Sequence, residues 1–362
     1  MEDLGVTFAG CSAFVTGHTG FKGSWLSLWL SELGAKVVGF SQPPPTQPSN
    51  FEVSGVAERL SRHIEGDIRD LHALSTAMRD AGPDLVIHMA AQPLVRDSYE
   101  RPVETFETNV MGTVNVLESV RRLDRPCTVI VVTSDKCYEN VGQLWGYRET
   151  DRMGGHDPYS ASKGAAELVV RSYRESFFNP ARLASHGKKL ASVRAGNVIG
   201  GGDWAKDRIV VDLVQAFALG QPAILRNPSS TRPWQHVLDA LHGYLTLAAR
   251  MRQDDAAWLC DGWNFGPSDA SAWAVERLAA AFCEVWPGGQ YRSADGSSGA
   301  HEARTLRLDS TKAQAMLGWQ PRWTTQEAVL HTASWFKRYY AGGTAMRDVC
   351  LEQIRAFSAT GA

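Results

Sequence analysis

The sequence lacks the long apolar run of a membrane protein and the charge excess of a protein that binds polyanions. No apolar stretch approaches the roughly 18 residues of a membrane span, and the start lacks the basic-then-apolar pattern of a signal peptide. Lysine and arginine total 37 against 39 aspartate and glutamate, a net charge of −2. Nucleic acid and anionic membrane surfaces attract a positive field. We therefore expect a cytoplasmic chain with neither as partner.

Cysteine is scarce and shows no paired spacing. The six cysteines are scattered along the chain without a CxxC pair, so we interpret them as reduced thiols and predict neither a disulfide framework nor a metal site. With 44% hydrophobic and 21% charged residues, the 362-residue chain has an ordinary globular composition. It is long enough for one large domain or two.

A glycine-rich turn stands between the first predicted strand and the first long helix. Residues 11–16 form a short apolar strand, and Gly17, Gly20 and Gly23 follow at once. Helical apolar spacing then runs over 24–33. Glycine lets a pyrophosphate approach the backbone, and a helix N-terminus offers free N–H groups. The context favours a dinucleotide site over a tight turn without a ligand.

The ends of the next two predicted strands support the adenosine-binding part of the dinucleotide site less strongly. After the strand over 36–40 the chain reads Ser41-Gln42, where NAD-binding folds often carry an acid. This position leaves NAD and NADP both open. Asp67 ends the predicted strand over 62–68 and either bonds the adenine amino group or caps the helix that begins near Asp70. His88, within the apolar strand over 84–92, is interpreted as a core histidine.

The strongest chemical signal follows the strand over 128–132. Thr133-Ser-Asp-Lys136 stands at its carboxyl end, where open α/β sheets bind ligands. Asp157-Pro158 then predicts a helix start. Tyr159 and Lys163, four residues apart on that helix, share one face. These groups predict a proton-transfer site beside a bound cofactor.

Alternating strands and helices predict an α/β fold, a Rossmann-like doubly wound parallel sheet with a smaller, interleaved C-terminal substrate domain. The rhythm breaks after Ala195, where the glycine-rich loop 196–204 has no strand of its own. One more strand, over 262–267, is expected to return to the sheet. The expected NAD-binding domain covers 1–196 and about 231–267, the sugar-nucleotide domain 197–230 and 268–345, and a C-terminal tail 346–362.

These motifs resemble the extended short-chain dehydrogenase/reductases, in the nucleotide-sugar dehydratase branch, from about Ser12 to about Tyr340. The three glycines and the Tyr159-x-x-x-Lys163 pair mark only the superfamily. More specific segments are similar to the CDP-sugar members and not to the UDP-galactose epimerases; they cover 133–140, 145–149, 194–200 and 232–237.

The resemblance implies dehydration of CDP-glucose to CDP-4-keto-6-deoxy-glucose through bound NAD, with NADP not excluded. The implied catalytic residues are Ser134, Asp135, Lys136, Tyr159 and Lys163. The implied cofactor-binding residues are Gly17, Thr19, Gly20, Phe21, Gly23, Asp67, Ile68, Ala90, Ala91, Gln92, Asn109, Tyr159 and Lys163. The implied substrate-binding residues are Ser134, Asn197, Arg208, Arg232 and Arg304. No metal is implied.

The implied roles follow an internal oxidation, elimination and reduction. Tyr159 would take the proton of the 4-hydroxyl with its pKa lowered by Lys163, and Asp135 would protonate the departing 6-hydroxyl. Related dTDP-glucose enzymes carry glutamate where this chain has Lys136, which leaves the base at carbon 5 open. Lys136 could be that base, could stabilise the enolate, or could simply pair with Glu139; Asp135 could handle both protons.

Three other readings remain open at this level. A 4-epimerase uses the same tyrosine and lysine, and a dehydratase could act on another nucleotide sugar. A regulator that binds a dinucleotide without turnover is the alternative from another class. The family resemblance also implies a homodimer or homotetramer formed through the helices over 102–122 and 158–177.

Overall fold

A seven-stranded parallel sheet forms the centre of the computed structural model, which describes residues 4–253, 256–267, 273–294 and 306–360. The strand order is β11-β6-β5-β4-β1-β2-β3, and every pairing is parallel. The strands are β1 (Ser12–Thr16), β2 (Lys36–Ser41), β3 (Arg62–Glu65), β4 (Leu85–His88), β5 (Cys127–Val132), β6 (Lys188–Arg194) and β11 (Gly262–Asn264). The order reverses between β1 and β4, which is where such sheets open a crevice for ligands.

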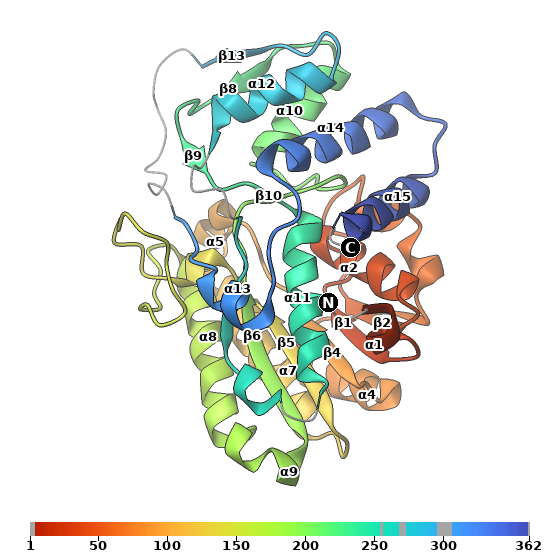
Figure 1. Cartoon of the computed structure of the whole chain (residues 1–362), viewed down its shortest axis with the longest axis vertical. Helices are drawn as coiled ribbons and strands as arrows, with labels where there is room; N and C mark the ends of the chain where they lie inside the picture. The colour runs from red at the N-terminus through yellow and green to blue at the C-terminus, as the bar shows by residue number, and fades with distance from the viewer. Residues whose placement is uncertain (1–3, 254–255, 268–272, 295–305, 361–362) are drawn as a thin grey trace.

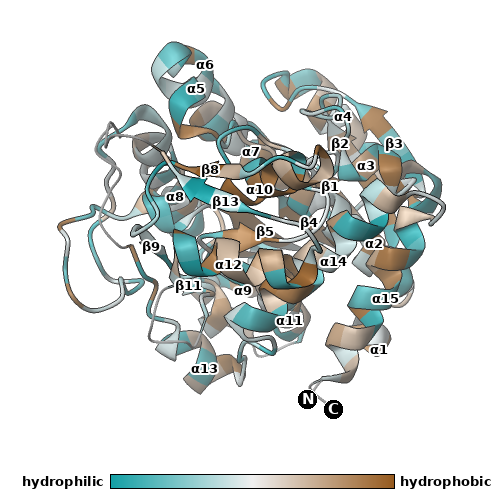
Figure 2. Ribbon diagram, turned by 90° about the horizontal axis from the view of Figure 1, so that it is seen from above, coloured by the Kyte–Doolittle hydropathy of each residue, from teal (hydrophilic) through white to brown (hydrophobic). Residues whose placement is uncertain are grey.

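Helices cover both faces of this sheet because successive side chains of each buried strand point to opposite sides. In β1, Ala13 and Val15 join the hydrophobic cluster beneath α2 (Phe21–Glu32) and α11 (Val237–Met251). Phe14 joins the cluster on the other face. The helices of that face are α4 (Leu71–Ala81), α7 (Gly112–Arg121) and α8 (Pro158–Ser176). Figure 2 shows hydrophobic β5 at the centre of these layers. The predicted doubly wound α/β fold is confirmed.

A smaller group of elements lies above the carboxyl ends of the strands (Figure 1). It contains three two-stranded sheets, in which β13 pairs with β8, β12 with β9 and β10 with β7. The bounds are β7 (Val198–Ile199), α10 (Ile209–Ala218), β8 (Ala223–Leu225), β9 (Thr231–Arg232), β10 (Gln235–His236), β12 (Trp273–Ala274), α12 (Val275–Val285), β13 (Tyr291–Ser293) and α14 (Thr325–Ala341). The glycine-rich loop 196–204, expected without a strand, contains β7, whose Val198 and Ile199 are buried against β10.

Shorter helices complete the connections. They are α1 (Leu4–Phe8), α3 (Asn50–Val53), α5 (Val95–Glu100), α6 (Pro102–Phe106), α9 (Leu183–His186), α13 (Thr311–Leu317) and α15 (Met346–Ala359), with 3₁₀ turns η1 (Val56–Arg59), η3 (Asp135–Cys137), η4 (Pro180–Arg182) and η5 (Ala256–Leu259). The helix expected over 102–122 is α6 and α7 joined by a π-helical turn, η2 (Glu107–Met111). No helix in the described part of the chain combines the length and apolarity needed to cross a membrane.

The C-terminal tail expected over 346–362 is instead the helix α15. Its apolar residues recur at helical spacing, and Met346, Val349, Ile354 and Phe357 are buried in the larger core cluster. The helix packs against α2 and α14. It therefore lies between the helix that follows the glycine turn and the last helix of the smaller group.

A buried carboxyl group lies between α11 and the segment before α14. One oxygen of Asp239 accepts the backbone N–H of Arg322 at 2.7 Å, and Oδ2 has no hydrogen-bond partner among the described residues. Burial raises the pKa of Asp239 from 3.8 to about 7. Between about pH 4 and pH 7 the unfolded chain releases this proton while the folded chain keeps it, so the free energy of unfolding falls as the pH rises. Above that window the loss is complete.

We expect Asp239→Asn to stabilise the protein at high pH only. The amide keeps the acceptor for Arg322 and removes the buried charge, so the melting temperature should rise by about 2–6 °C near pH 8 and change little near pH 4.5. Thermal melts at both pH values test this, with the exposed Asp80→Asn on α4 as control. An equal shift at both pH values would contradict the assignment.

Candidate active site

The glycine turn between β1 and α2 leaves unoccupied space in front of the N-terminus of α2. Gly17 has φ +75°, and a Cβ there would lie 2.6 Å from the Ala90 nitrogen. A Cβ on Gly23 would lie 2.1 Å from the Gly17 oxygen, whereas one on Gly20 would meet only that oxygen, at 3.4 Å. Gly20 begins α2 without a side-chain cap. The free N–H groups and the open space over Gly20 fit a pyrophosphate.

The adenosine side is built from the ends of β2 and β3. The Thr19 hydroxyl lies 2.8 Å from that of Ser41 and donates to the Gln42 carbonyl at 2.9 Å. The Gln42 amide donates to Asp67 at 2.8 Å. Burial acts to raise the pKa of Asp67, but hydrogen bonds from Arg69 hold it below its usual value. The cap of α4 is Asp70, not Asp67, since Asp70 accepts the Ala73 N–H at 3.0 Å. The capping alternative for Asp67 is therefore wrong, and its role toward the adenine stays a prediction.

Asn109, in the π-helical turn, joins the end of β4 to α8. Its Oδ1 accepts the Gln92 N–H at 2.8 Å, and its amide donates to the Gln92 carbonyl at 3.1 Å and to Ser162 at 2.8 Å. Such single π turns are frequent at functional sites. His88, the last residue of β4, is hydrogen-bonded to Thr16 and Thr113, and burial lowers its pKa to about 3. The prediction of a core histidine is confirmed.

The proton-transfer residues meet where β5 ends and α8 begins. Ser134 donates to the Asp135 carboxylate at 2.9 Å, and its hydroxyl acts to lower the pKa of the Tyr159 phenol. Asp157 caps α8 by accepting the Ser160 N–H at 2.9 Å, which confirms the predicted helix start. Ser134, Asp135, Tyr159 and Lys163 are all buried. Lys163 follows Tyr159 by one turn on the same helix face.

The charges at this site differ from the expectation in one respect. The sequence predicts that Lys163 lowers the pKa of Tyr159, but burial raises that pKa to about 12, opposed first by the hydrogen bond from Ser134. Burial, followed by the charge of Lys22, lowers the pKa of Lys163 to about 8. Lys22 itself was not among the predicted residues. Its signal was a cation in the first turn of α2, a position that disfavours positive charge.

Lys136 differs from its neighbours in solvent exposure. The side chain is exposed, although Asp135 before it and Cys137 after it are buried. No ion pair joins Lys136 to Glu139 within the ranges that the structure describes. For Lys136 to act as a base, burial or a nearby cation would have to favour its neutral amine. The side chain is exposed, so burial does not do so.

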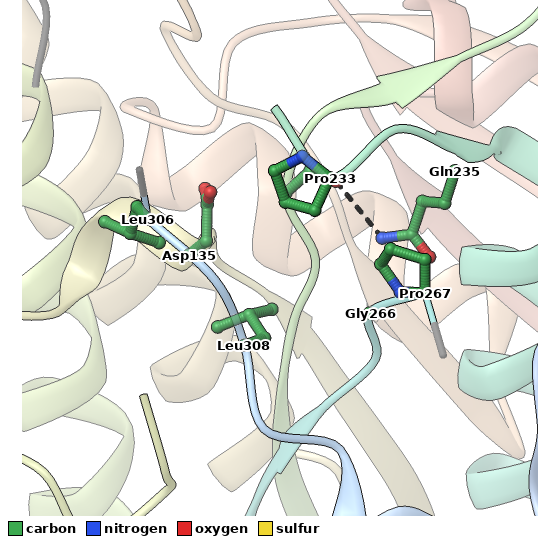
Figure 3. A pocket seen from close by; sticks show the side chains of 8 residues that line it. Asp135, Pro233, Gln235, Gly266, Pro267, Leu306 and Leu308 are labelled. Atoms are coloured by element: carbon green, nitrogen blue, oxygen red, sulfur yellow. Dashed lines mark hydrogen bonds between the residues drawn. The ribbon is translucent and has the colours of Figure 1, made fainter. Parts of the chain in front are cut away.

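Asp135 faces a small cavity beneath the smaller group of elements (Figure 3). The cavity holds about 10 Å³ and is lined by Asp135, Gly196, Pro233, Gln235, Gly266, Pro267, Leu306 and Leu308. A Cβ on Gly196 would lie 2.2 Å from the Asp135 carboxylate, so only glycine fits there. Gln235 donates to the Gly196 carbonyl at 3.1 Å and fixes that loop. Both residues lie in motifs that the sequence singled out, but neither was chosen as a site residue.

The predicted substrate residues are only partly brought together. Asn197 adjoins Gly196 with φ +48°. The charge of Arg208 reaches the site, since it acts to lower the pKa of Tyr159. Arg232 is half-buried on β9, and its guanidinium donates to the Thr231 carbonyl at 2.8 Å. Arg304 lies outside the described residues. Those residues contain no cluster of His, Cys, Asp or Glu suited to a metal ion.

The fold and this group of side chains define a dinucleotide-binding α/β protein of the short-chain dehydrogenase/reductase type. Residues 14–332 match the family model described as GDP-mannose 4,6 dehydratase. The chain is 51% identical over 333 residues to the CDP-glucose 4,6-dehydratase of Salmonella typhimurium, covering 92% of each. It is 25% identical over 341 residues to the dTDP-glucose 4,6-dehydratase of Xanthomonas campestris pv. campestris, covering 89% of this chain and 92% of that one.

Solved structures share the fold at lower identity. Pal from Bacillus thuringiensis superposes with a TM-score of 0.76 at 22% identity, over 90% of this chain and 98% of that chain. DesIV, the dTDP-glucose 4,6-dehydratase of Streptomyces venezuelae with NAD bound, gives 0.72 at 22%, over 90% and 96%. The chain belongs to the GDP-mannose 4,6-dehydratase family, a nucleotide-sugar dehydratase branch of the extended short-chain dehydrogenase/reductases.

Proposed function

We propose that this protein is a lyase that converts CDP-glucose to CDP-4-keto-6-deoxy-glucose and water with NAD as its resident cofactor. The observation that carries the proposal is the buried Asp135 beside Ser134 and Tyr159, in a chain that is 51% identical to a CDP-glucose 4,6-dehydratase. A 4-epimerase needs no acid at carbon 6, so a buried carboxylate at this strand end favours dehydration.

The turn of Gly17, Gly20 and Gly23 would hold the NAD pyrophosphate, with Thr19 and Asp67 on the adenosine side. NAD held there would supply the hydride chemistry, as acceptor from sugar carbon 4 and donor to carbon 6. The end of β2 carries Ser41 and Gln42, with neither an acid for the ribose hydroxyls nor an arginine for a 2′-phosphate, so this position leaves NADP open as well.

The remaining steps are proton transfers made by residues of the chain. Tyr159 takes the 4-hydroxyl proton while Ser134 donates a hydrogen bond to the developing oxygen. The Ser134 hydroxyl and the charge of Arg208 act to lower the pKa of Tyr159. The 4-ketone then acidifies the hydrogen on carbon 5. A base, Lys136 or Asp135, takes that proton, and Asp135 gives a proton to the departing 6-hydroxyl, which leaves as water. When hydride reaches carbon 6, the same base returns a proton to carbon 5. The burial of Asp135 keeps bulk water from competing for its proton.

Nuclear magnetic resonance of CDP-glucose with the enzyme and sub-stoichiometric NAD tests the proposal. A 4-keto-6-deoxy product without net NADH is expected, with dTDP-glucose, UDP-glucose and GDP-mannose in parallel tubes. A 4-epimer alone would move the protein to the epimerases, and turnover of another sugar alone would change the substrate. Bound NAD with no turnover in any tube would favour the regulator.

Lys136→Met addresses the proton on carbon 5. If Lys136 is the base, we expect kcat to fall by about 10²–10³-fold, with loss of deuterium exchange at carbon 5 from solvent. Mass spectrometry of the product formed in deuterated water measures that exchange. The exposed Lys337→Met on α14 serves as control. Near-normal turnover with exchange retained would instead assign both protons to Asp135.

The proposal extends to assembly and location. Exposed apolar side chains mark the two helices expected to pair: Val103 is 69% exposed, Met111 52% and Leu168 58%. These stripes support a homodimer or homotetramer through α6–α7 and α8. The six free cysteines support a cytoplasmic location. In this scheme 1–196 with 231–267 binds NAD, and 197–230 with 268–345 binds the sugar nucleotide.

A further inference from the structure

A buried carboxylate lies directly behind the proton-transfer residues. Glu167 follows Lys163 by one turn of α8 and Tyr159 by two, so its side chain lies on the helix face turned to the sheet. It accepts four hydrogen bonds: from Thr133 Oγ1 at 2.5 Å, Ser192 Oγ at 2.7 Å, and Arg194 Nε and Nη2 at 2.8 Å each.

These bonds join the two halves of the catalytic group. Thr133 immediately precedes Ser134 and Asp135 at the end of β5, while Glu167 stands on the helix that holds Tyr159 and Lys163. The Thr133–Glu167 bond is therefore a direct side-chain link between the strand end and the helix. It adds a directional bond to the packing that sets the spacing of Ser134 from Tyr159, and such a bond resists rotation and sliding more than apolar packing does.

Arg194 extends the link to the loop after η3 and to β11 of the central sheet. Its Nη1 donates to the Tyr138 hydroxyl, which donates to Asn264 Oδ1 at 2.8 Å. The Asn264 amide in turn donates to the Tyr147 carbonyl at 2.8 Å. The backbone after η3 and the last strand of the sheet are thus tied to the same carboxylate.

The pair is ionised at neutral pH. Burial acts to raise the pKa of Glu167, but the charge and hydrogen bonds of Arg194 hold it below its usual value. Buried ion pairs contribute little net stability compared with apolar residues of similar volume, because both charges lose their hydration. A fully satisfied network of this kind instead fixes geometry.

We propose that Glu167 and Arg194 are positioning residues, whose ion pair and Thr133 bond set the spacing between Tyr159 on α8 and Ser134 and Asp135 on β5. The assignment rests on the dehydratase function proposed above. Misplacement of reacting groups by about 1 Å can lower a rate by about 10²-fold without changing substrate affinity. Loss of the link should therefore lower kcat and leave KM unchanged.

Thr133→Val is the first test, because valine keeps the shape and Glu167 keeps its three other hydrogen bonds. We expect kcat to fall about 3–30-fold with KM within about twofold and the melting temperature within about 3 °C. The pH profile of kcat should shift, since the Ser134 hydrogen bond that lowers the pKa of Tyr159 is loosened. Glu175→Gln, at an exposed ion pair with Arg171 on the same helix, is the matched control.

The double variant Glu167→Leu with Arg194→Met separates positioning from stability. The single variant Glu167→Gln removes one partner of the buried ion pair and should lose stability. Removing both charges in the double variant should restore most of that stability, while kcat stays at least about 10-fold below that of the wild type. Wild-type kcat in Thr133→Val, or in a double variant of wild-type stability, would overturn the inference. An inactive wild-type enzyme would instead refute the dehydratase function, so the two failures are distinguishable.

Discussion

Replacing Tyr159 with phenylalanine will lower kcat for CDP-glucose by at least about 10³-fold, because the acceptor of the 4-hydroxyl proton is lost and no other group replaces it. The phenol is buried, the Ser134 hydroxyl acts to lower its pKa, and it lies on the helix face shared with Lys163. Phenylalanine preserves that packing. The melting temperature and the affinity for the sugar nucleotide should therefore change little.

Single-turnover formation of NADH, followed by absorbance, measures the oxidation step directly in this variant. Tyr99→Phe on α5 removes an exposed phenol and should leave both the oxidation step and kcat at wild-type rates. Retention of more than about a tenth of wild-type kcat in Tyr159→Phe would mean that another group accepts the proton. Because burial raises the pKa of Tyr159 to about 12, wild-type kcat should also rise with pH across the neutral range. A flat profile would mean that proton transfer to Tyr159 does not limit the rate.

The fold could be predicted because its signals are local. The apolar strands, the three glycines and the Asp157-Pro158 helix start each lie within one short segment, and each predicts the element that the structure shows. The placement of Tyr159 and Lys163 on one helix face could be predicted for the same reason, since a spacing of four residues on a helix fixes it. The parallel order of the strands follows from the alternation of strands and helices.

The parts that could not be predicted depend on contacts between distant segments. Glu167 reads as an ordinary charge on an amphipathic helix until β6 brings Arg194 against it, 27 residues further along. The helix α15 has a clear apolar spacing, but only its docking on α2 shows that it is no tail. Lys136 offers the opposite case, since one turn of 3₁₀ helix directs it away from its buried neighbours.

Substitutions in the glycine turn are the second change for which we expect a large effect. They distinguish an effect on folding from an effect on cofactor binding. A Cβ on Gly23 would meet the Gly17 oxygen at 2.1 Å and the His18 Cα at 2.7 Å, both backbone atoms that cannot move aside. Gly23→Ala should therefore distort the turn, weaken NAD binding by at least about 10²-fold and destabilise the fold by about 1–3 kcal/mol. Titration with NAD and thermal melts without it measure the two effects.

Gly20→Ala is the informative contrast, because a Cβ there meets only the Gly17 oxygen, at 3.4 Å, and otherwise enters the space assigned to the pyrophosphate. We expect it to lose NAD affinity while its melting temperature without NAD stays near the wild-type value. Gly220→Ala, at an exposed turn with φ +65°, strains the backbone far from the glycine turn, a strain that Gly20→Ala does not introduce, and should bind NAD normally. If Gly20→Ala and Gly23→Ala both bound NAD within about threefold of wild type, the turn would not be the cofactor cradle, because neither added methyl could be tolerated against a bound pyrophosphate.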